Sequence, residues 1–205
     1  MDFNDTTAEA SFRAEVTGWL SENASAYGDS GTRRHPVKEE YEEDLKVARE
    51  WQAKKAEAGY AAILWPEEYG GRGGTPIEAA IYREEESKYS MPRGFFEIGI
   101  GMAGPTMMAY ATEEQNKRYL PKMRSGEEAW CQLFSEPGAG SDLAGLRMRA
   151  IQEGDEWVMN GSKVWTSGAH YCDYGILVVR HDPTIPKHRG LTYFFYRYAL
   201  AGDPD

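Results

Sequence analysis

The sequence predicts an α+β protein: an N-terminal all-helical domain over residues 1–125, followed by a partial antiparallel β-barrel-like domain over residues 126–205. In the first part, apolar residues recur three and four positions apart, which is the pattern of one buried helix face. After Ser125-Gly126 the apolar runs shorten, and turn pairs such as Asn160-Gly161 separate them, which is typical of strands. Helices followed by strands indicate two segregated domains, with a boundary near Ser125.

The first helix is expected to begin after Thr6, because Thr6 and Glu9 have the spacing of a capping box. Phe12, Val16 and Leu20 then share one face of that helix. Further helices are expected over residues 37–58, from Thr75 to Met91, over residues 95–111, and from Thr112 to about Pro121. The two that start at a threonine repeat the capping-box spacing. The region 95–111 is apolar and rich in glycine, so it predicts a buried helix.

Short strands are predicted in the second part of the chain, over residues 129–134, 146–152, 156–159, 163–166, 175–180 and 191–196. Gly154-Asp155 and Asn160-Gly161 are the turn pairs between the middle strands. No internal repeat is visible. The alternation of short strands and turns favours antiparallel pairing of neighbours in sequence.

The composition excludes several classes of function. With 23 basic and 33 acidic residues the formal net charge is −10, which disfavours binding to nucleic acid or to an acidic membrane surface. No apolar stretch approaches the ~20 residues that span a bilayer, and the acidic N-terminus has no signal-peptide pattern. Cys131 and Cys172 are expected to be reduced thiols, and the cytoplasm is the expected location.

The segment from Gln132 to Asp142 carries the strongest sign of a binding site. An apolar strand stops at Glu136-Pro137 and gives way to Gly138-Ala139-Gly140, where the chain lacks the Cβ atoms that would keep a ligand from the backbone. A nicotinamide-binding Rossmann turn needs a glycine or alanine at position 143, but Leu143 stands there and strands follow. Taken alone, a glycine-rich turn of this kind is more often a structural turn than a ligand site.

A second cluster, Trp165-Thr166-Ser167-Gly168, follows a predicted strand. The flat indole of Trp165 can cover one face of a planar heterocycle, and a neighbouring hydroxyl can donate to a ring nitrogen or carbonyl. The alternative interpretation is an ordinary tryptophan half-buried on a strand. His170 is close in sequence, but no group of residues has the spacing of metal ligands, so no metal is expected.

Four segments together resemble the acyl-CoA dehydrogenase family over nearly the whole chain, to about Phe195. They are Gly59 to Gly71, Glu113 to Pro121, Glu136 to Asp142, and Asn160 to Ser167. The resemblance implies a helical domain and a central β-domain that bind FAD and an acyl-CoA thioester. It also implies an electron-transferring flavoprotein as electron acceptor.

The resemblance also assigns roles by motif. The residues that it places at the flavin are Leu133, Phe134, Ser135, Trp165 and Ser167. Those that it places at the thioester substrate are Gln132 for the acyl group and Ser141 for the CoA portion. Among them, Trp165 is expected to cover a flavin face and Ser167 to approach flavin N5.

The reaction implied is α,β-dehydrogenation to a 2-enoyl-CoA, in which a carboxylate removes the α-proton. In the family that base is a glutamate of a C-terminal helical domain. We expect this chain to be a truncated member without that base, since residues 196–205 do not match the family. The run Glu84-Glu85-Glu86 is expected to face solvent and so not to replace the base.

Two alternatives stay open at this stage. The first alternative is a non-catalytic flavin-binding subunit or an inert fragment. The second is an acyl-CoA oxidase or a flavin monooxygenase on the same scaffold. The expected partners are further copies of the chain in a homo-oligomer, or a complementary chain that carries the C-terminal half and would restore activity.

Overall fold

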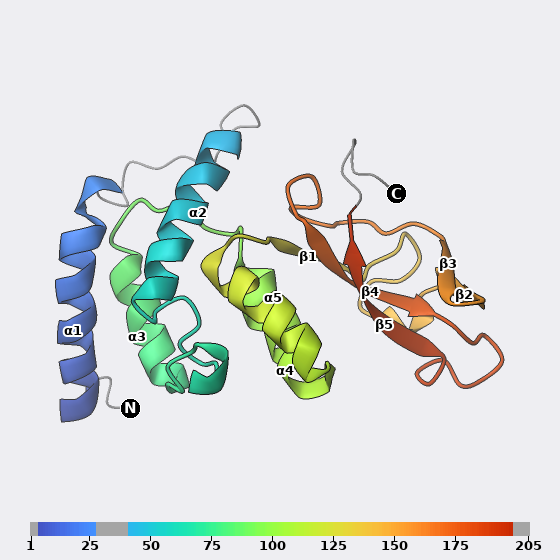
Figure 1. Cartoon of the computed structure of the whole chain (residues 1–205), viewed down its shortest axis with the longest axis horizontal. Helices are drawn as coiled ribbons and strands as arrows, with labels where there is room; N and C mark the ends of the chain where they lie inside the picture. The colour runs from blue at the N-terminus through green and yellow to red at the C-terminus, as the bar shows by residue number, and fades with distance from the viewer. Residues whose placement is uncertain (1–3, 28–40, 199–205) are drawn as a thin grey trace. The chain divides into compact units, whose positions relative to one another are not determined.

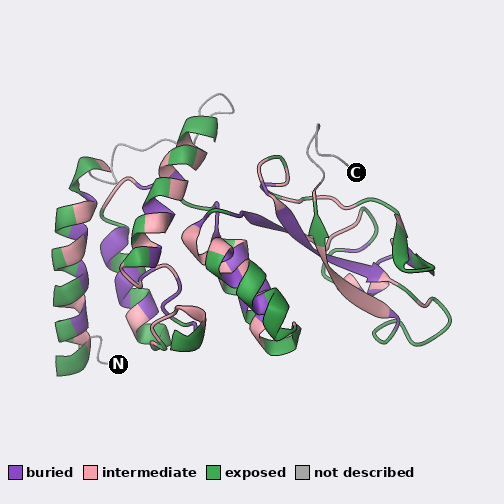
Figure 2. Ribbon diagram, in the orientation of Figure 1, coloured by how far each residue is buried: buried purple, intermediate pink, exposed green. Residues whose placement is uncertain are grey.

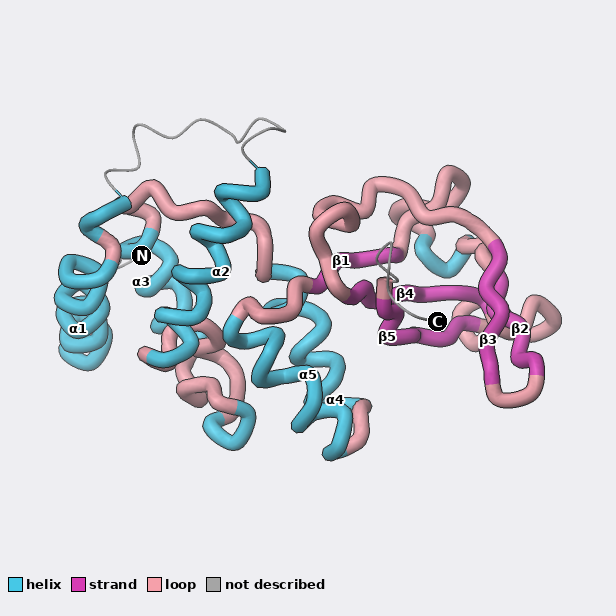
Figure 3. The backbone as a smooth tube through the Cα atoms, turned by 45° about the horizontal axis from the view of Figure 1, so that its top comes forward, coloured by secondary structure: helices cyan, strands magenta, loops and turns pink. Residues whose placement is uncertain are grey.

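The computed structural model describes residues 4–27 and 41–198. The chain forms two compact units, residues 1–127 (unit 1) and 128–205 (unit 2). Unit 1 holds the helices α1–α5, and unit 2 holds the strands β1–β5 (Figures 1 and 3). This confirms the predicted fold class. The break expected at residues 28–36, the start of the second helix before Tyr41, and the tail from residue 199 lie outside the described residues.

Three helices of unit 1, those capped by Thr6, Thr75 and Thr112, begin where the sequence predicts. The elements are α1 (Thr7–Asn23), α2 (Tyr41–Glu57), α3 (Pro76–Glu86), a π-helix (Gly99–Ala103), α4 (Gly104–Tyr110) and α5 (Glu113–Ser125). The hydroxyl groups of Thr6, Thr75 and Thr112 accept hydrogen bonds from the backbone N–H three residues later, at 3.3, 3.2 and 3.2 Å. The three capping boxes are therefore confirmed.

The helix expected over residues 95–111 is divided into the π-helix and α4. In a π-helix the carbonyl of residue i accepts from the N–H of residue i+5. For Ile100 that residue is Pro105, which has no N–H. The Ile100 carbonyl accepts instead from the indole N–H of Trp65, at 2.9 Å. A proline thus leaves a carbonyl for a side chain from the loop before α3.

Helix α5 continues through Pro121 to Ser125, beyond its expected end. Proline removes one helical N–H, but Leu120 and Met123 on either side are both buried and hold this turn in place. Gly126, with a φ of 79°, ends the helix in the left-handed conformation that favours glycine.

The core of unit 1 lies between α1, α2 and α3, where their buried faces meet (Figure 2). Val16 and Leu20 of α1 are fully buried in it. Trp51 of α2 packs against Trp19, with ring centroids 5.2 Å apart. The ring of Tyr82 from α3 stacks on Tyr60 at 5.1 Å. Aromatic rings thus join all three helices.

The prediction that the acidic run of α3 faces solvent is wrong for two of its three residues. Glu85 and Glu86 are only 3% and 8% exposed, whereas the side chain of Glu84 is 63% exposed. Arg13 of α1 pairs with Glu85 at 2.8 Å, and the indole N–H of Trp51 donates to Glu86 at 2.8 Å. A charged group is buried only where ion pairs or hydrogen bonds compensate for its loss of water. Here the compensating groups, Arg13 and Trp51, come from other helices.

Unit 2 is built around one strand. Its elements are β1 (Trp130–Leu133), β2 (Arg149–Glu153), β3 (Glu156–Asn160), β4 (Tyr174–Arg180) and β5 (Leu191–Arg197). The strand order is β1-β4-β2-β3, and β5 also pairs with β4, in an open sheet. Residues 174–179 of β4 are all buried.

The sheet is mixed. The expected antiparallel pairing holds for β2 with β3 and for β4 with β5, but β1 and β2 pair with β4 in parallel. Strand pairs distant in sequence carry no turn signal, so the pattern could not reveal their direction. The strand expected over residues 163–166 is absent from the described structure of unit 2, where this segment has an irregular conformation. Gly154-Asp155 forms the β2–β3 turn, while Asn160-Gly161 ends β3.

Cys131 and Cys172 are both buried free thiols. Within residues 4–27 and 41–198, no helix combines the length and the apolar character needed to cross a membrane. The same described residues contain no group of histidine, cysteine and acidic side chains able to hold a metal ion.

Two glycines three residues apart give a matched test of packing in unit 1. A Cβ at Gly104 would lie 2.1 Å from the Trp65 ring, which is 2% exposed and hydrogen-bonded, whereas a Cβ at Gly101 would meet nothing within 4 Å. We expect Gly104→Ala to lower the free energy of unfolding by about 3 kcal/mol or more. Gly101→Ala, the control, is expected to change it by less than about 1 kcal/mol. Urea unfolding measures both, and equal losses would contradict this account of the Trp65 site.

Candidate functional site

The loop that follows β1 forms a tight turn at the predicted binding motif. Glu136 and Ala139 exchange two backbone hydrogen bonds of 2.9 and 3.0 Å. A Cβ added at Gly138 or Gly140 would meet nothing within 4 Å in the described structure, and neither glycine has a left-handed φ. Packing and backbone conformation within unit 2 therefore give no reason for glycine at these two positions. Close approach of an external ligand would give one.

The structure brings the two sequence motifs together. The backbone N–H of Val164 donates to the carbonyl of Ser135 at 2.9 Å. The ammonium of Lys163 donates to the carbonyl of Phe134 at 3.1 Å and pairs with the carboxylate of Glu136 at 2.9 Å. The segment 163–167 thus runs beside the start of the loop. Residues nearly thirty positions apart, Lys163 and Phe134, lie in one site.

Glu136 is the acceptor at the centre of this arrangement. Its two carboxylate oxygens accept from the backbone N–H of Arg147 at 2.6 Å and of Met148 at 2.9 Å, in addition to Lys163. Burial by itself raises the pKa of Glu136, but the hydrogen bonds from Arg147, Lys163 and Met148 outweigh it. The pKa of Glu136 is therefore lowered from its ordinary value, and the group is a carboxylate at neutral pH.

Trp165 is presented outward from unit 2. The residue is 90% exposed. Its backbone has the left-handed conformation, with a φ of 60°. This contradicts the interpretation of Trp165 as a tryptophan half-buried on a strand. A left-handed conformation costs a residue with a side chain about 1–2 kcal/mol. Strained backbone that presents a large aromatic ring to solvent is typical of a binding site.

The other predicted site residues differ in their surroundings. Leu133 packs against the cluster of Ala150, Leu177 and Val179. The ring of Phe134 packs edge-on against that of Tyr193, with ring centroids 6.3 Å apart. Both side chains are partly buried within unit 2. Gln132 and Ser135 are also partly buried, whereas Ser141 and Ser167 are exposed. The polar members therefore have at least part of their surface free for a ligand.

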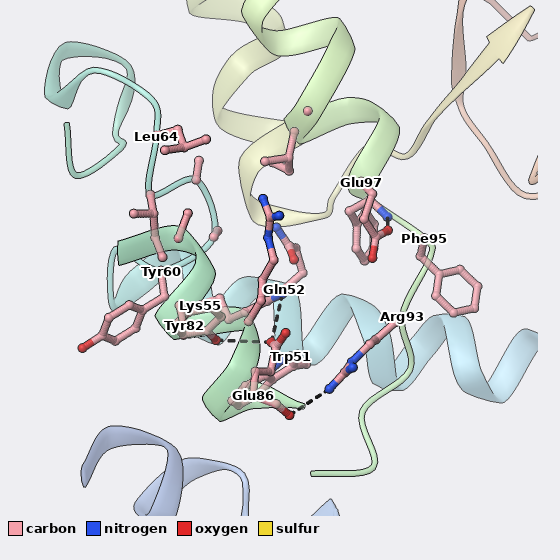
Figure 4. A pocket seen from close by; sticks show the side chains of 18 of the residues that line it. Trp51, Gln52, Lys55, Tyr60, Leu64, Tyr82, Glu86, Arg93, Phe95 and Glu97 are labelled. Carbon is pink, nitrogen blue, oxygen red and sulfur yellow. Dashed lines mark hydrogen bonds and ion pairs between the residues drawn. The ribbon is translucent and has the colours of Figure 1, made fainter. Parts of the chain in front are cut away.

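Unit 1 contains a cavity that the sequence did not reveal. Its volume is about 730 Å³, within the range of small-molecule sites. Aromatic and aliphatic side chains from α2, α3 and the segment before α4 line most of it (Figure 4). The labelled lining residues are Trp51, Gln52, Lys55, Tyr60, Leu64, Tyr82, Glu86, Arg93, Phe95 and Glu97.

Glu86 is the charged group that anchors one wall of this cavity. It accepts from the indole N–H of Trp51 at 2.8 Å and from the Tyr82 hydroxyl at 3.2 Å, and it lies 3.4 Å from the Lys55 ammonium. Arg93 donates to the backbone carbonyl of Glu86 at 2.9 Å (Figure 4). Burial raises the pKa of Tyr82, and the Glu86 carboxylate raises it further. The wall is a set of mutually satisfied polar groups beside apolar surface.

One signal of this cavity was present in the sequence. Tyr82 and Glu86 are four residues apart and therefore share a helix face. Because Tyr82 belongs to the apolar stripe of α3, a carboxylate on the same face is expected to be buried. The run of three glutamates obscured that spacing.

Comparison with known proteins identifies the family. Residues 21–127 match the acyl-CoA dehydrogenase N-terminal domain, and residues 131–202 match the acyl-CoA dehydrogenase middle domain. The acyl-CoA dehydrogenase IpdE1 of Mycobacterium tuberculosis is 40% identical over 187 residues, which cover 89% of this chain and 47% of that protein. The chain belongs to the acyl-CoA dehydrogenase family, whose members are oxidoreductases that bind FAD.

Solved structures agree with this assignment. The steroid acyl-CoA dehydrogenase Tcur3481–Tcur3483 matches with a TM-score of 0.76 and 34% identity, covering 96% of this chain and 49% of that chain. The ChsE4–ChsE5 complex of Mycobacterium tuberculosis matches with a TM-score of 0.76 and 33% identity, covering 96% and 48%. The chain thus spans about half the length of the IpdE1 relative and of these structures.

The lowered pKa of Glu136 predicts a pH dependence of stability. A group whose pKa is lowered on folding stabilises the fold above its unfolded-state pKa, and this contribution is lost as pH falls through its folded-state pKa. The ordinary value is 4.5. Near neutral pH, the free energy of unfolding of Glu136→Gln is therefore expected to be about 2 kcal/mol lower than that of the wild type. This difference is expected to shrink below about pH 4.5. Urea unfolding across this pH range measures the difference; a pH-independent difference would contradict the assignment.

The left-handed conformation of Trp165 predicts that glycine is more stable than alanine at this position. Trp165→Gly is expected to be about 1 kcal/mol more stable than Trp165→Ala, because only glycine adopts this φ without strain. The alanine variant is the control, since both changes remove the indole. Thermal unfolding of the two variants tests the point, and greater stability of the alanine variant would rule out strain at this residue.

Proposed function

We propose that this chain binds FAD at the site formed by residues 132–141 and 163–167, and that it takes part in the α,β-dehydrogenation of an acyl-CoA thioester. One observation carries the proposal: the hydrogen bond between Val164 and Ser135 brings two motifs distant in sequence together beside an outward-facing indole. Membership of the family supports it. When bound, FAD supplies the acceptor for the hydride that leaves the β-carbon.

The residues present fit an isoalloxazine ring. The exposed ring of Trp165 offers a flat apolar face of the kind that covers a planar heterocycle. Ser135 and Ser167, from the two segments joined by the Val164–Ser135 hydrogen bond, offer hydroxyl groups able to donate to ring nitrogens or carbonyls. The positions of Gly138 and Gly140, open on the Cβ side, leave the backbone accessible to a ligand. We propose that Leu133 and Phe134 support the ring edge from the partly buried side.

We propose that the thioester contacts Gln132 through its acyl part and Ser141 through its CoA part. We propose separately that the cavity of unit 1, taken by itself, binds an apolar group. Its volume of about 730 Å³ and its aromatic walls suit a bulky chain or ring better than a short acyl group. The names of the matched structures include steroid acyl-CoA dehydrogenases, which is consistent with a bulky substrate class.

Removal of the α-proton requires a carboxylate base within hydrogen-bonding reach. In the described loop of unit 2 the acidic side chains are committed elsewhere: Glu136 pairs with Lys163 and Asp142 pairs with Lys187. We propose that the base comes from outside unit 2, from a partner polypeptide in an assembly. ChsE4–ChsE5, a matched structure, is itself a complex of two named components. An electron-transferring flavoprotein is the proposed acceptor of the electrons.

The test is FAD retention by the purified chain. After incubation with FAD and gel filtration, we expect a flavin absorption band with a shifted and structured envelope. Trp165→Ala is expected to weaken FAD binding about tenfold, in line with the 1–3 kcal/mol of stacking on an aromatic side chain. Trp157→Ala, which removes a partly exposed indole from β3, is the control and is expected to leave FAD affinity unchanged. A colourless wild-type chain would contradict FAD binding by this chain alone.

A further inference from the structure

Glu136 and Lys163 form a buried ion pair that nothing in the reaction itself requires. Their charged atoms lie 2.9 Å apart, and the two side chains are only 8% and 4% exposed. The pair connects three segments of unit 2. Lys163 donates to the Phe134 carbonyl, and Glu136 accepts from the N–H groups of Arg147 and Met148.

An ion pair of this kind is a poor source of stability. Removing two charges from water costs several kcal/mol per ion, and apolar residues of similar volume often stabilise a core as well or better. Asp142, in the same loop as Glu136, provides a contrast: it pairs with Lys187 of the β4–β5 connection at 2.8 Å, but the side chains of Lys187 and Asp142 are 52% and 64% exposed. Exposed pairs contribute little. The Glu136–Lys163 pair is therefore better explained by the geometry that it imposes.

The geometry concerns both halves of the proposed flavin site. Glu136 directly follows Ser135, and Lys163 stands two residues before Trp165. Between them, the Val164 N–H holds the Ser135 carbonyl at 2.9 Å. Trp165 has a strained φ of 60°, and its exposed indole has few contacts within unit 2 to fix its direction. The preceding backbone thus fixes the Cα–Cβ bond from which the indole projects.

We propose that Glu136 and Lys163 are positioning residues, which hold the loop after β1 and the segment before Trp165 in one fixed arrangement so that Ser135 and the Trp165 indole address the same ligand. This inference rests on the proposed function for the identity of the ligand, FAD. The arrangement itself is a property of the free chain. It is therefore open to measurement without any ligand.

The first test replaces the ammonium with an apolar group of similar length, Lys163→Met, and follows amide hydrogen exchange in the chain without FAD. We expect protection of the amides of Val164, Arg147 and Met148 to fall about tenfold or more, which corresponds to about 1.4 kcal/mol. Amides of β4 and β5 are expected to keep their protection. Unchanged exchange at Val164 would overturn the proposal, and an equal loss throughout β4 and β5 would show a general role in stability instead.

Two further variants separate positioning from charge. Lys187→Met removes the same charge from the exposed pair with Asp142 and is the matched control, with exchange and FAD binding expected to match the wild type. The exchanged pair Glu136→Lys with Lys163→Glu restores opposite charges but leaves the N–H groups of Arg147 and Met148 without their acceptor. We expect no rescue by this double variant, and full recovery of Val164 protection would contradict the role of Glu136.

The second measurement uses FAD. In the wild type with FAD bound, the Trp165 emission is expected to be quenched, and Lys163→Met is expected to weaken FAD binding at least tenfold while far-UV circular dichroism stays the same. Equal FAD affinity in Lys163→Met and the wild type would overturn the proposal. If the wild type itself retains no FAD, the proposed function fails for the isolated chain, and the exchange data still decide whether the pair holds the two segments together.

Discussion

The arrangement of unit 2 depends on one carboxylate that accepts three hydrogen bonds. Glu136 lies in the loop after β1 and accepts from the backbone N–H groups of Arg147 and Met148 and from the ammonium of Lys163. A buried acceptor of this kind leaves its donors unsatisfied when it is removed, which costs more than the net worth of each bond. Residues at the start of this loop are therefore held in place by Glu136, while Gly138 and Gly140 stay open to a ligand.

Unit 1 uses the same device around Glu86. Glu86 lies on the buried face of α3. Its carboxylate accepts from the Trp51 indole N–H and the Tyr82 hydroxyl, and it pairs with the Lys55 ammonium. The result is a cavity wall with polar groups fixed among themselves and aromatic surface left for a ligand. In both units, a buried glutamate holds the polar groups around it beside a candidate binding surface.

Membership of the acyl-CoA dehydrogenase family and the placement of Trp165 support each other. The family implies a planar cofactor, and the structure shows a tryptophan whose exposure and backbone strain have no explanation within the described part of unit 2. Natural proteins depart from local rules chiefly at functional sites. A residue that is strained, apolar and exposed is consistent with selection for a contact outside the unit.

The sequence by itself determined where α1, α3 and α5 begin, because caps such as Thr75 and Glu78 act over three residues and apolar stripes act over one turn. It also determined most strand positions and the motifs that mark the family. Only the tertiary structure decided the parallel pairing of β1 with β4, the burial of Glu85 and Glu86, and the irregular course of residues 163–166. Each of these depends on partners far away in the chain, Arg13 for Glu85 and Ser135 for Val164, and spacing along a sequence carries no information about such partners.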